Sequence, residues 1–245
     1  AWSAGAGLYA FVSRYRNVAQ ARWAVAILAL MPLFFGAAQF ANMDMLVASM
    51  ITLCVLAAAD TALRRGAGRP FRAMSIATGV LAALAVLAKG LIGLALPGAI
   101  VLAWLLLRRD WRGMRALLWV PALLAFAVVA VPWFWLMQVK FPGFYHYFFV
   151  YQHFERFAQS GFNNAQPFWF YVPIVVGLSL PWSIWAVPLL KPAFWREADP
   201  QGLRRLMAIW IAVVMVFFSI PQSKLIGYVL PVFPPLALLI SERLA

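Results

Sequence analysis

Long apolar runs alternate with short polar segments along the whole chain. Nine such runs occupy residues 1–13, 22–40, 45–63, 73–88, 91–107, 116–137, 168–190, 204–220 and 226–241. Most are long enough to cross about 30 Å of hydrocarbon as helices, which satisfy their own backbone hydrogen bonds. The pattern predicts an all-α, polytopic membrane protein of about nine transmembrane helices, with residues 1–245 forming a single transmembrane domain.

The runs at 73–88 and 91–107 are short and nearly continuous. If they were fused into one helix of about 35 residues, that helix would extend roughly 52 Å, which is too long for a bilayer. We therefore expect a break at Lys89 and Gly90, with the two runs forming a helical hairpin.

The distribution of positive charge supports this hairpin. With simple alternation of the spans, sixteen of the twenty Lys and Arg residues fall on one side, in the segments 14–22, 64–72, 108–115 and 191–205 and at Arg243. Cytoplasmic loops carry such an excess, so this side is predicted to be cytoplasmic. The opposite, periplasmic side then carries the long loop at 138–167 and four cations, which are Lys89, Lys140, Arg156 and Lys224.

Composition narrows the class of protein further. The chain is 65% hydrophobic and 11% charged, with a mean hydropathy of +0.86, which a soluble domain of this length would not have. The net charge of +13 is spread over short loops and is accompanied by no nucleic-acid-binding motif, so we expect no nucleic-acid partner. The single cysteine, Cys54, excludes an intrachain disulfide.

Several cations on the face away from the cytosol suggest an anion there. Lysine and arginine both bind phosphate, and in a membrane enzyme the obvious phosphate belongs to a lipid carrier. Each candidate also has a structural reading. Asp44 could serve the helix N-terminus that follows it, Lys89 could extend to the interface, and Arg156 could pair with Glu155 or Asp44.

A metal site is only weakly indicated. His146 and His153 are seven residues apart, so on a helix they lie two turns apart, too far to bind one metal without other ligands. No metal ligand and no cofactor is therefore assigned, and whether a divalent ion joins the long loop stays open.

Several stretches together resemble one family. They are NMDM at 42–45, AKGLIGLALP at 88–97, YFFVYQHFERF at 147–157, PFWFYVP at 167–173, LPW at 180–182 and FFSIPQSKLIGYVLPVFPPLALL at 217–239. In this order they are similar to the bacterial GT-C glycosyltransferases that take sugars from polyprenyl phosphates. That family includes the lipid A aminoarabinose transferases, and the protein O-mannosyltransferases are wider relatives.

The resemblance implies an inverting membrane glycosyltransferase in the bacterial inner membrane, with its active site facing the periplasm. Its donor would be an undecaprenyl-phosphate sugar, its acceptor lipid A or a protein, and membrane lipids would surround it. Asp44 is implied as a catalytic carboxylate that orients an acceptor or a cationic donor sugar. The implied lipid-phosphate and substrate-binding residues are Lys89, His153, Glu155, Arg156, Lys224 and Tyr228.

One departure from the family stands out. The family's principal carboxylate lies in the first extracytoplasmic loop, in a D-E-x-x-Y-like setting that this chain lacks. We therefore expect the chain to be a fragment, truncated at both ends and inactive alone. The alternative function is a transporter or flippase for a lipid-linked or anionic solute, although the predicted spans carry almost no charge.

Overall fold

The computed structural model describes residues 1–40, 42–149 and 164–244. In these residues the fold is helical, with one isolated β-bridge between Ala165 and Ser223. The elements are α1 (Trp2–Tyr15), α2 (Val18–Leu30), α3 (Pro32–Ala38), α4 (Met43–Gly66), α5 (Arg72–Lys89), α6 (Ile92–Leu107), α7 (Trp111–Leu117), α8 (Val120–Lys140), α10 (Tyr171–Leu178), η2 (Trp182–Leu190), α11 (Pro192–Arg196), α12 (Leu203–Ser219), η3 (Ile226–Val232) and α13 (Phe233–Ser241).

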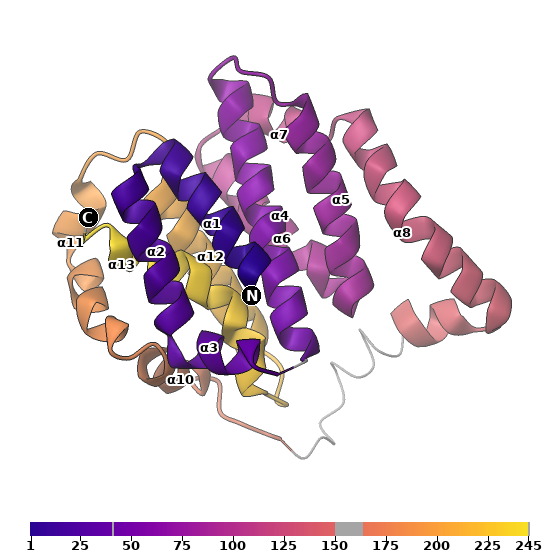
Figure 1. The fold of residues 1–245 in the computed structure, drawn as a ribbon. Coiled ribbons are helices and arrows are strands. Elements are labelled where there is room, and N and C mark those ends of the chain that lie inside the picture. Colours follow the sequence, from indigo (N-terminus) through magenta and orange to yellow (C-terminus); the bar gives the residue numbers. More distant parts are fainter. Residues whose placement is uncertain (41, 150–163, 245) are drawn as a thin grey trace.

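Helix α4 is the centre of the bundle. It packs against α1, α5, α6, α7 and η3, and 83% of its most apolar 18-residue segment is buried. Helix α8 is at the edge, where it lies beside α5 (Figure 1), and only 17% of the most apolar part of Trp111–Lys140, which includes α8, is buried. The exposed side of α8 is therefore an apolar surface, of the kind that contacts lipid or other helices in a membrane protein.

The hairpin predicted at Lys89 and Gly90 is present. Helix α5 ends at Lys89, and Gly90 has a φ of +82°, a conformation that costs glycine least. The two helices then cross at backbone contact, because a Cβ on Gly93 would lie 2.2 Å from the carbonyl carbon and oxygen of Ala85.

Several predicted runs are broken rather than straight. The run 22–40 bends by 71° between α2 and α3, where Pro32 begins the second helix. The run 168–190 consists of α10 followed by the 3₁₀ helix η2, and the run 226–241 consists of η3 followed by α13.

The all-α membrane class is thus confirmed. In the described residues, however, three helices are long and apolar enough to span, or four if the bent pair counts as one, against about nine predicted.

The basic segments meet at one end of the bundle, which we call the basic face. Arg14 of α1 and Arg64 of α4 both pair with Asp60, at 2.5 and 3.0 Å. Arg16 pairs with Asp199 at 2.9 Å, and Arg108 donates to the carbonyl of Gln201. These contacts join the segments 14–22, 64–72, 108–115 and 191–205 as the charge pattern predicts.

Candidate active site at the ends of α4, α5 and η3

Asp44 and Lys89 form an ion pair at the end of the bundle opposite the basic face. Asp44 is in the first turn of α4, and its Oδ1 accepts a hydrogen bond from the Nζ of Lys89, the last residue of α5. The helix cap itself is Asn42, whose side chain accepts from the backbone N–H of Asp44. Because Asn42 caps the helix, the Asp44 carboxylate is available for the lysine.

Tyr228 of η3 completes this cluster. Its ring lies 4.5 Å from the Lys89 Nζ, within the range of a cation–π contact, and 5.2 Å from the ring of Phe218. The preceding residue, Gly227, leaves room for the carboxylate, because a Cβ there would be 2.6 Å from the Asp44 Oδ2. Neither Phe218 nor Gly227 was singled out by the sequence, although both lie in the stretch 217–239 that carries the family resemblance.

These groups line a small pocket between α4, α5, η3 and the flanking helices. Its volume is about 10 Å³, and its walls are Asp44, Val47, Ile51, Lys89, Ile92, Phe218, Gly227, Tyr228 and Pro231. Such a volume holds about one water molecule, and the ion pair of Asp44 and Lys89 forms part of its wall. The side chains of Lys89 and Asp44 are 32% and 17% exposed, so a larger anion approaching from outside would meet the ammonium group first.

Lys224 is in a different environment from Lys89. It is only 4% exposed, and its Nζ donates to the carbonyl oxygens of Gln166, at 3.0 Å, and Pro221, at 2.5 Å. Burial lowers the pKa of its ammonium group. Lys224 does not line the pocket of Asp44 and Lys89. Instead it acts as a tether, because its side chain connects the segment before η3 to Gln166 at the end of the long loop.

That tether joins two distant segments. The backbone N–H of Lys224 donates to the carbonyl of Asn164 at 3.1 Å, and the N–H of Gln166 donates to the carbonyl of Gln222 at 3.0 Å. Together with the Lys224 ammonium, these bonds fix the point where the long loop returns to the bundle.

The other predicted residues of the long loop cannot be placed. His153, Glu155 and Arg156 lie outside the described residues, so their assignment stays a prediction. Within the described part of the chain, no group of three His, Cys, Asp or Glu side chains could hold a metal ion, and His146 is exposed on the surface. The loop itself begins at Phe141, three residues later than predicted, because α8 continues to Lys140.

The fold and the cluster together define a polytopic α-helical membrane protein with a carboxylate, an ammonium group and a tyrosine gathered at one end of the bundle. The family model described as dolichyl-phosphate-mannose-protein mannosyltransferase matches residues 6–148. The chain therefore belongs to this family, within the GT-C class of membrane proteins.

Relatives in bacteria share most of the chain. The undecaprenyl phosphate-alpha-4-amino-4-deoxy-L-arabinose arabinosyl transferase of Enterobacter sp. (strain 638) is 31% identical over 219 residues, which are 86% of this chain and 38% of that protein. The arabinosyl transferase 1 of Sodalis glossinidius (strain morsitans) is 32% identical over 227 residues, 92% of this chain and 40% of that protein. The chain thus spans about two fifths of the length of these relatives.

Solved structures agree with the family assignment. The crystal structure of ArnT from Cupriavidus metallidurans bound to undecaprenyl phosphate matches with a TM-score of 0.85 and 29% identity, covering 99% of this chain and 44% of that one. Its apo form matches with a TM-score of 0.83 and 28% identity. The GT-C fold is therefore shared over almost the whole chain.

Proposed function

We propose that the chain is part of an inverting membrane glycosyltransferase that moves a sugar from undecaprenyl phosphate to lipid A or to a protein. Two kinds of support exist: the printed activities of the relatives, and the cluster of Asp44, Lys89 and Tyr228. The observation that carries the proposal is the position of Lys89. Lys89 lines a small pocket, and its partly exposed ammonium group pairs with a carboxylate at the end of the bundle away from the basic face.

In the proposed reaction an acceptor oxygen attacks the anomeric carbon of the donor sugar. The bond from that carbon to the phosphate oxygen breaks, and undecaprenyl phosphate leaves with the electron pair. Phosphate leaves easily, so the main demand on the protein is to stabilise the charge that develops on it. Lys89 can do so as a point charge, with Arg156 as the predicted second cation.

The Asp44–Lys89 pair has two roles in this proposal. In the free protein Asp44 and the ring of Tyr228 hold the Lys89 ammonium in place, which limits the entropy lost when phosphate binds. When phosphate takes over the ammonium group, the Asp44 carboxylate becomes available to orient a cationic sugar or an acceptor hydroxyl. A phosphate acceptor, as on lipid A, needs no base, whereas a hydroxyl acceptor needs one, and a carboxylate is suitable.

The orientation in the membrane is part of the proposal. The positive-inside rule places the basic face in the cytosol and the Asp44–Lys89 pocket on the periplasmic side of the bacterial inner membrane. The loop at 141–166 would then be periplasmic, with the contact of Lys224 and Gln166 fixing the point where it returns to the bundle. A cysteine-accessibility experiment with Ser223→Cys and Ala67→Cys tests this, because an impermeant thiol reagent added to spheroplasts should label only the first.

The activity is tested with the full-length protein and a radiolabelled undecaprenyl-phosphate aminoarabinose donor in liposomes. Label that moves to added lipid A supports the transferase. Donor-dependent movement of label across the bilayer without transfer would contradict it and would support the transporter instead.

A further inference from the structure

Two groups of arginines on the basic face differ in their surroundings. In the first group, carboxylates neutralise the cations. Asp60 pairs with Arg14 and Arg64, and the acids Glu197, Asp199 and Glu242 pair with Arg16, Arg204 and Arg243. These ion pairs hold helices together and leave little positive charge for a ligand.

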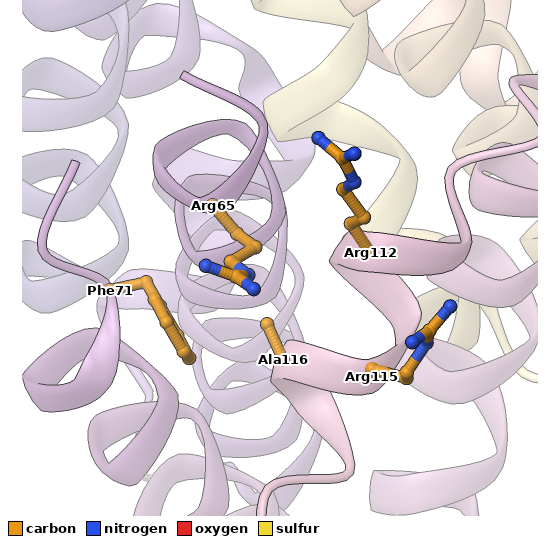
Figure 2. A pocket seen from close by; sticks show the side chains of 5 residues that line it. All are labelled: Arg65, Phe71, Arg112, Arg115 and Ala116. Carbon is orange, nitrogen blue, oxygen red and sulfur yellow. The ribbon is translucent and has the colours of Figure 1, made fainter. Parts of the chain in front are cut away.

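The second group has no carboxylate within it. Arg65, Arg112 and Arg115 line a pocket of about 110 Å³ together with Phe71 and Ala116, which we call the arginine pocket (Figure 2). In the part of the chain that the structure describes, none of these three arginines makes an ion pair. The nearest acid in sequence, Asp110, accepts the backbone N–H of Gly113 at 2.8 Å and serves as the cap of α7.

The frame of this pocket is fixed by close packing. The Ser75 hydroxyl of α5 donates to the carbonyl of Ala116 at 2.7 Å, and a Cβ on Gly113 would lie 2.9 Å from the Cβ of Ala62 on α4. Helix α7 is therefore held tightly against α4 and α5. The guanidinium groups, in contrast, are exposed: Arg112 and Arg115 extend outward from α7, and Arg65 lies between Phe71 and Ala116 (Figure 2).

Three arginine side chains that line one cavity fit the chemistry of a phosphate. Each offers a planar pair of N–H donors that matches two phosphate oxygens, and arginine holds such pairs better than lysine because it is more weakly hydrated. The volume is roughly ten times that needed for one water, so a phosphate group has room. A phosphate bound there would offset part of the positive charge that these three side chains give the surface.

The surroundings of the pocket favour a lipid as the source of that phosphate. Trp111 is 55% exposed, and Leu118 and Val120, at the junction of α7 and α8, are 61% and 63% exposed. Trp119 stacks edge-on with Phe71 at 6.1 Å and lies under Arg72 at 5.6 Å. Exposed tryptophans mark the head-group level of a bilayer, and exposed aliphatic side chains below them contact acyl chains.

We propose that the arginine pocket binds the phosphate of an anionic phospholipid in the leaflet at the basic face. This site is at the opposite end of the bundle from the Asp44–Lys89 pocket and is independent of the proposed transferase activity. Basic pockets between transmembrane helices are known to hold anionic head groups. The bound lipid would connect the ends of α4 and α7 through Arg65, Arg112 and Arg115.

The test compares two double variants of the full-length protein that lose the same charge from the same face. R112Q/R115Q removes two of the three positive charges that line the pocket, whereas R22Q/R205Q removes two exposed arginines that do not line it. Lipid affinity is measured by native mass spectrometry with phosphatidylglycerol, with phosphatidylcholine as the uncharged comparison. We expect R112Q/R115Q to bind phosphatidylglycerol roughly 10- to 30-fold more weakly, and the control variant to change less than about threefold.

Two further measurements identify the ligand and keep the test valid if one variant misfolds. Inorganic phosphate at millimolar concentration should not displace the lipid; if it does so completely, the pocket is a site for a soluble anion and the lipid assignment is wrong. Equal loss in both double variants would show a diffuse surface potential and overturn the site. R65Q reaches the pocket from α4 rather than α7, so it should weaken binding even if R112Q/R115Q fails to fold, and unchanged binding in R65Q would contradict the proposal.

Discussion

Asp44 and Asp60 lie on the same helix, sixteen residues apart, and at 1.5 Å per residue about 24 Å separates them. Asp60 is 2% exposed and is shared by Arg14, Arg64 and the hydroxyl of Tyr15. Asp44 is more exposed and, among the described residues, pairs with one cation, Lys89, beside a pocket. The comparison shows that partner number and access, rather than the presence of an ion pair, distinguish a structural carboxylate from one that can exchange its partner.

The largest effect is expected from Lys89→Ala in the full-length protein. Loss of one preorganised group that stabilises the leaving phosphate should lower the turnover number about 10²- to 10³-fold. The measurement is transfer of label from the donor to lipid A at saturating donor concentration. The matched control is Lys140→Ala, at the end of α8, which should keep near-normal turnover. Near-normal turnover in Lys89→Ala would remove this residue from the active site.

Asp60→Asn should instead affect folding. Two arginines would lose their buried anionic partner, and because they are 39% and 25% exposed we expect a cost of about 2 kcal/mol, less than for a fully buried pair. Thermal unfolding in detergent measures this loss. Turnover per folded molecule should stay unchanged, and a specific loss of turnover without loss of stability would contradict the structural role.

Gly227→Ala tests the geometry of the pocket without removing a charge. The new Cβ would lie 2.6 Å from the Asp44 Oδ2, so the carboxylate must move and its contact with Lys89 must loosen. We expect kcat/KM to fall about tenfold, a cost of about 1.4 kcal/mol. Gly98→Ala on α6, where no atom lies within 4 Å of the new Cβ, is the control. Equal activities of the two variants would show that the Asp44 position is not critical.

The smallest effect concerns Lys224→Met and pH. Burial lowers the pKa of Lys224 below 10.5, its ordinary value, so between these two values the unfolded chain binds more protons than the folded one. The stability of the wild-type protein should therefore rise with pH through that window, and it should be flat below it. In Lys224→Met this rise should be reduced. An identical pH dependence of thermal unfolding in both proteins would show that Lys224 does not cause it.

The distribution of charged residues along the sequence predicted the main features of the fold. The hairpin at Lys89 and Gly90 was inferred because only this break leaves sixteen cations on one side, and the ion pairs of Arg14, Arg16 and Arg64 confirm that these segments meet. The joint location of Asp44, Lys89 and Tyr228 followed from the same topology together with the family resemblance.

The sequence could not show where the apolar runs bend, nor which group each cation contacts. Hydropathy is nearly the same for a straight helix and for the sequence of α10 and η2, so the run 168–190 was read as one span. Lys224 was expected to share an anion with Lys89, but two backbone carbonyls lie within reach of its ammonium group. Contacts with the backbone depend on the chain's path and leave no pattern in side-chain types.

The crossing of α5 and α6 at Gly93 constrains how such proteins can diversify. Any side chain at this position would push the two helices apart, so mutation cannot gradually shift the Lys89 turn relative to α4. Under the proposed function, a change of sugar or acceptor would depend on residues that this crossing does not hold, such as those of η3 that line the Asp44–Lys89 pocket. The ammonium group of Lys89, which we propose meets the carrier phosphate, would keep its position through such changes.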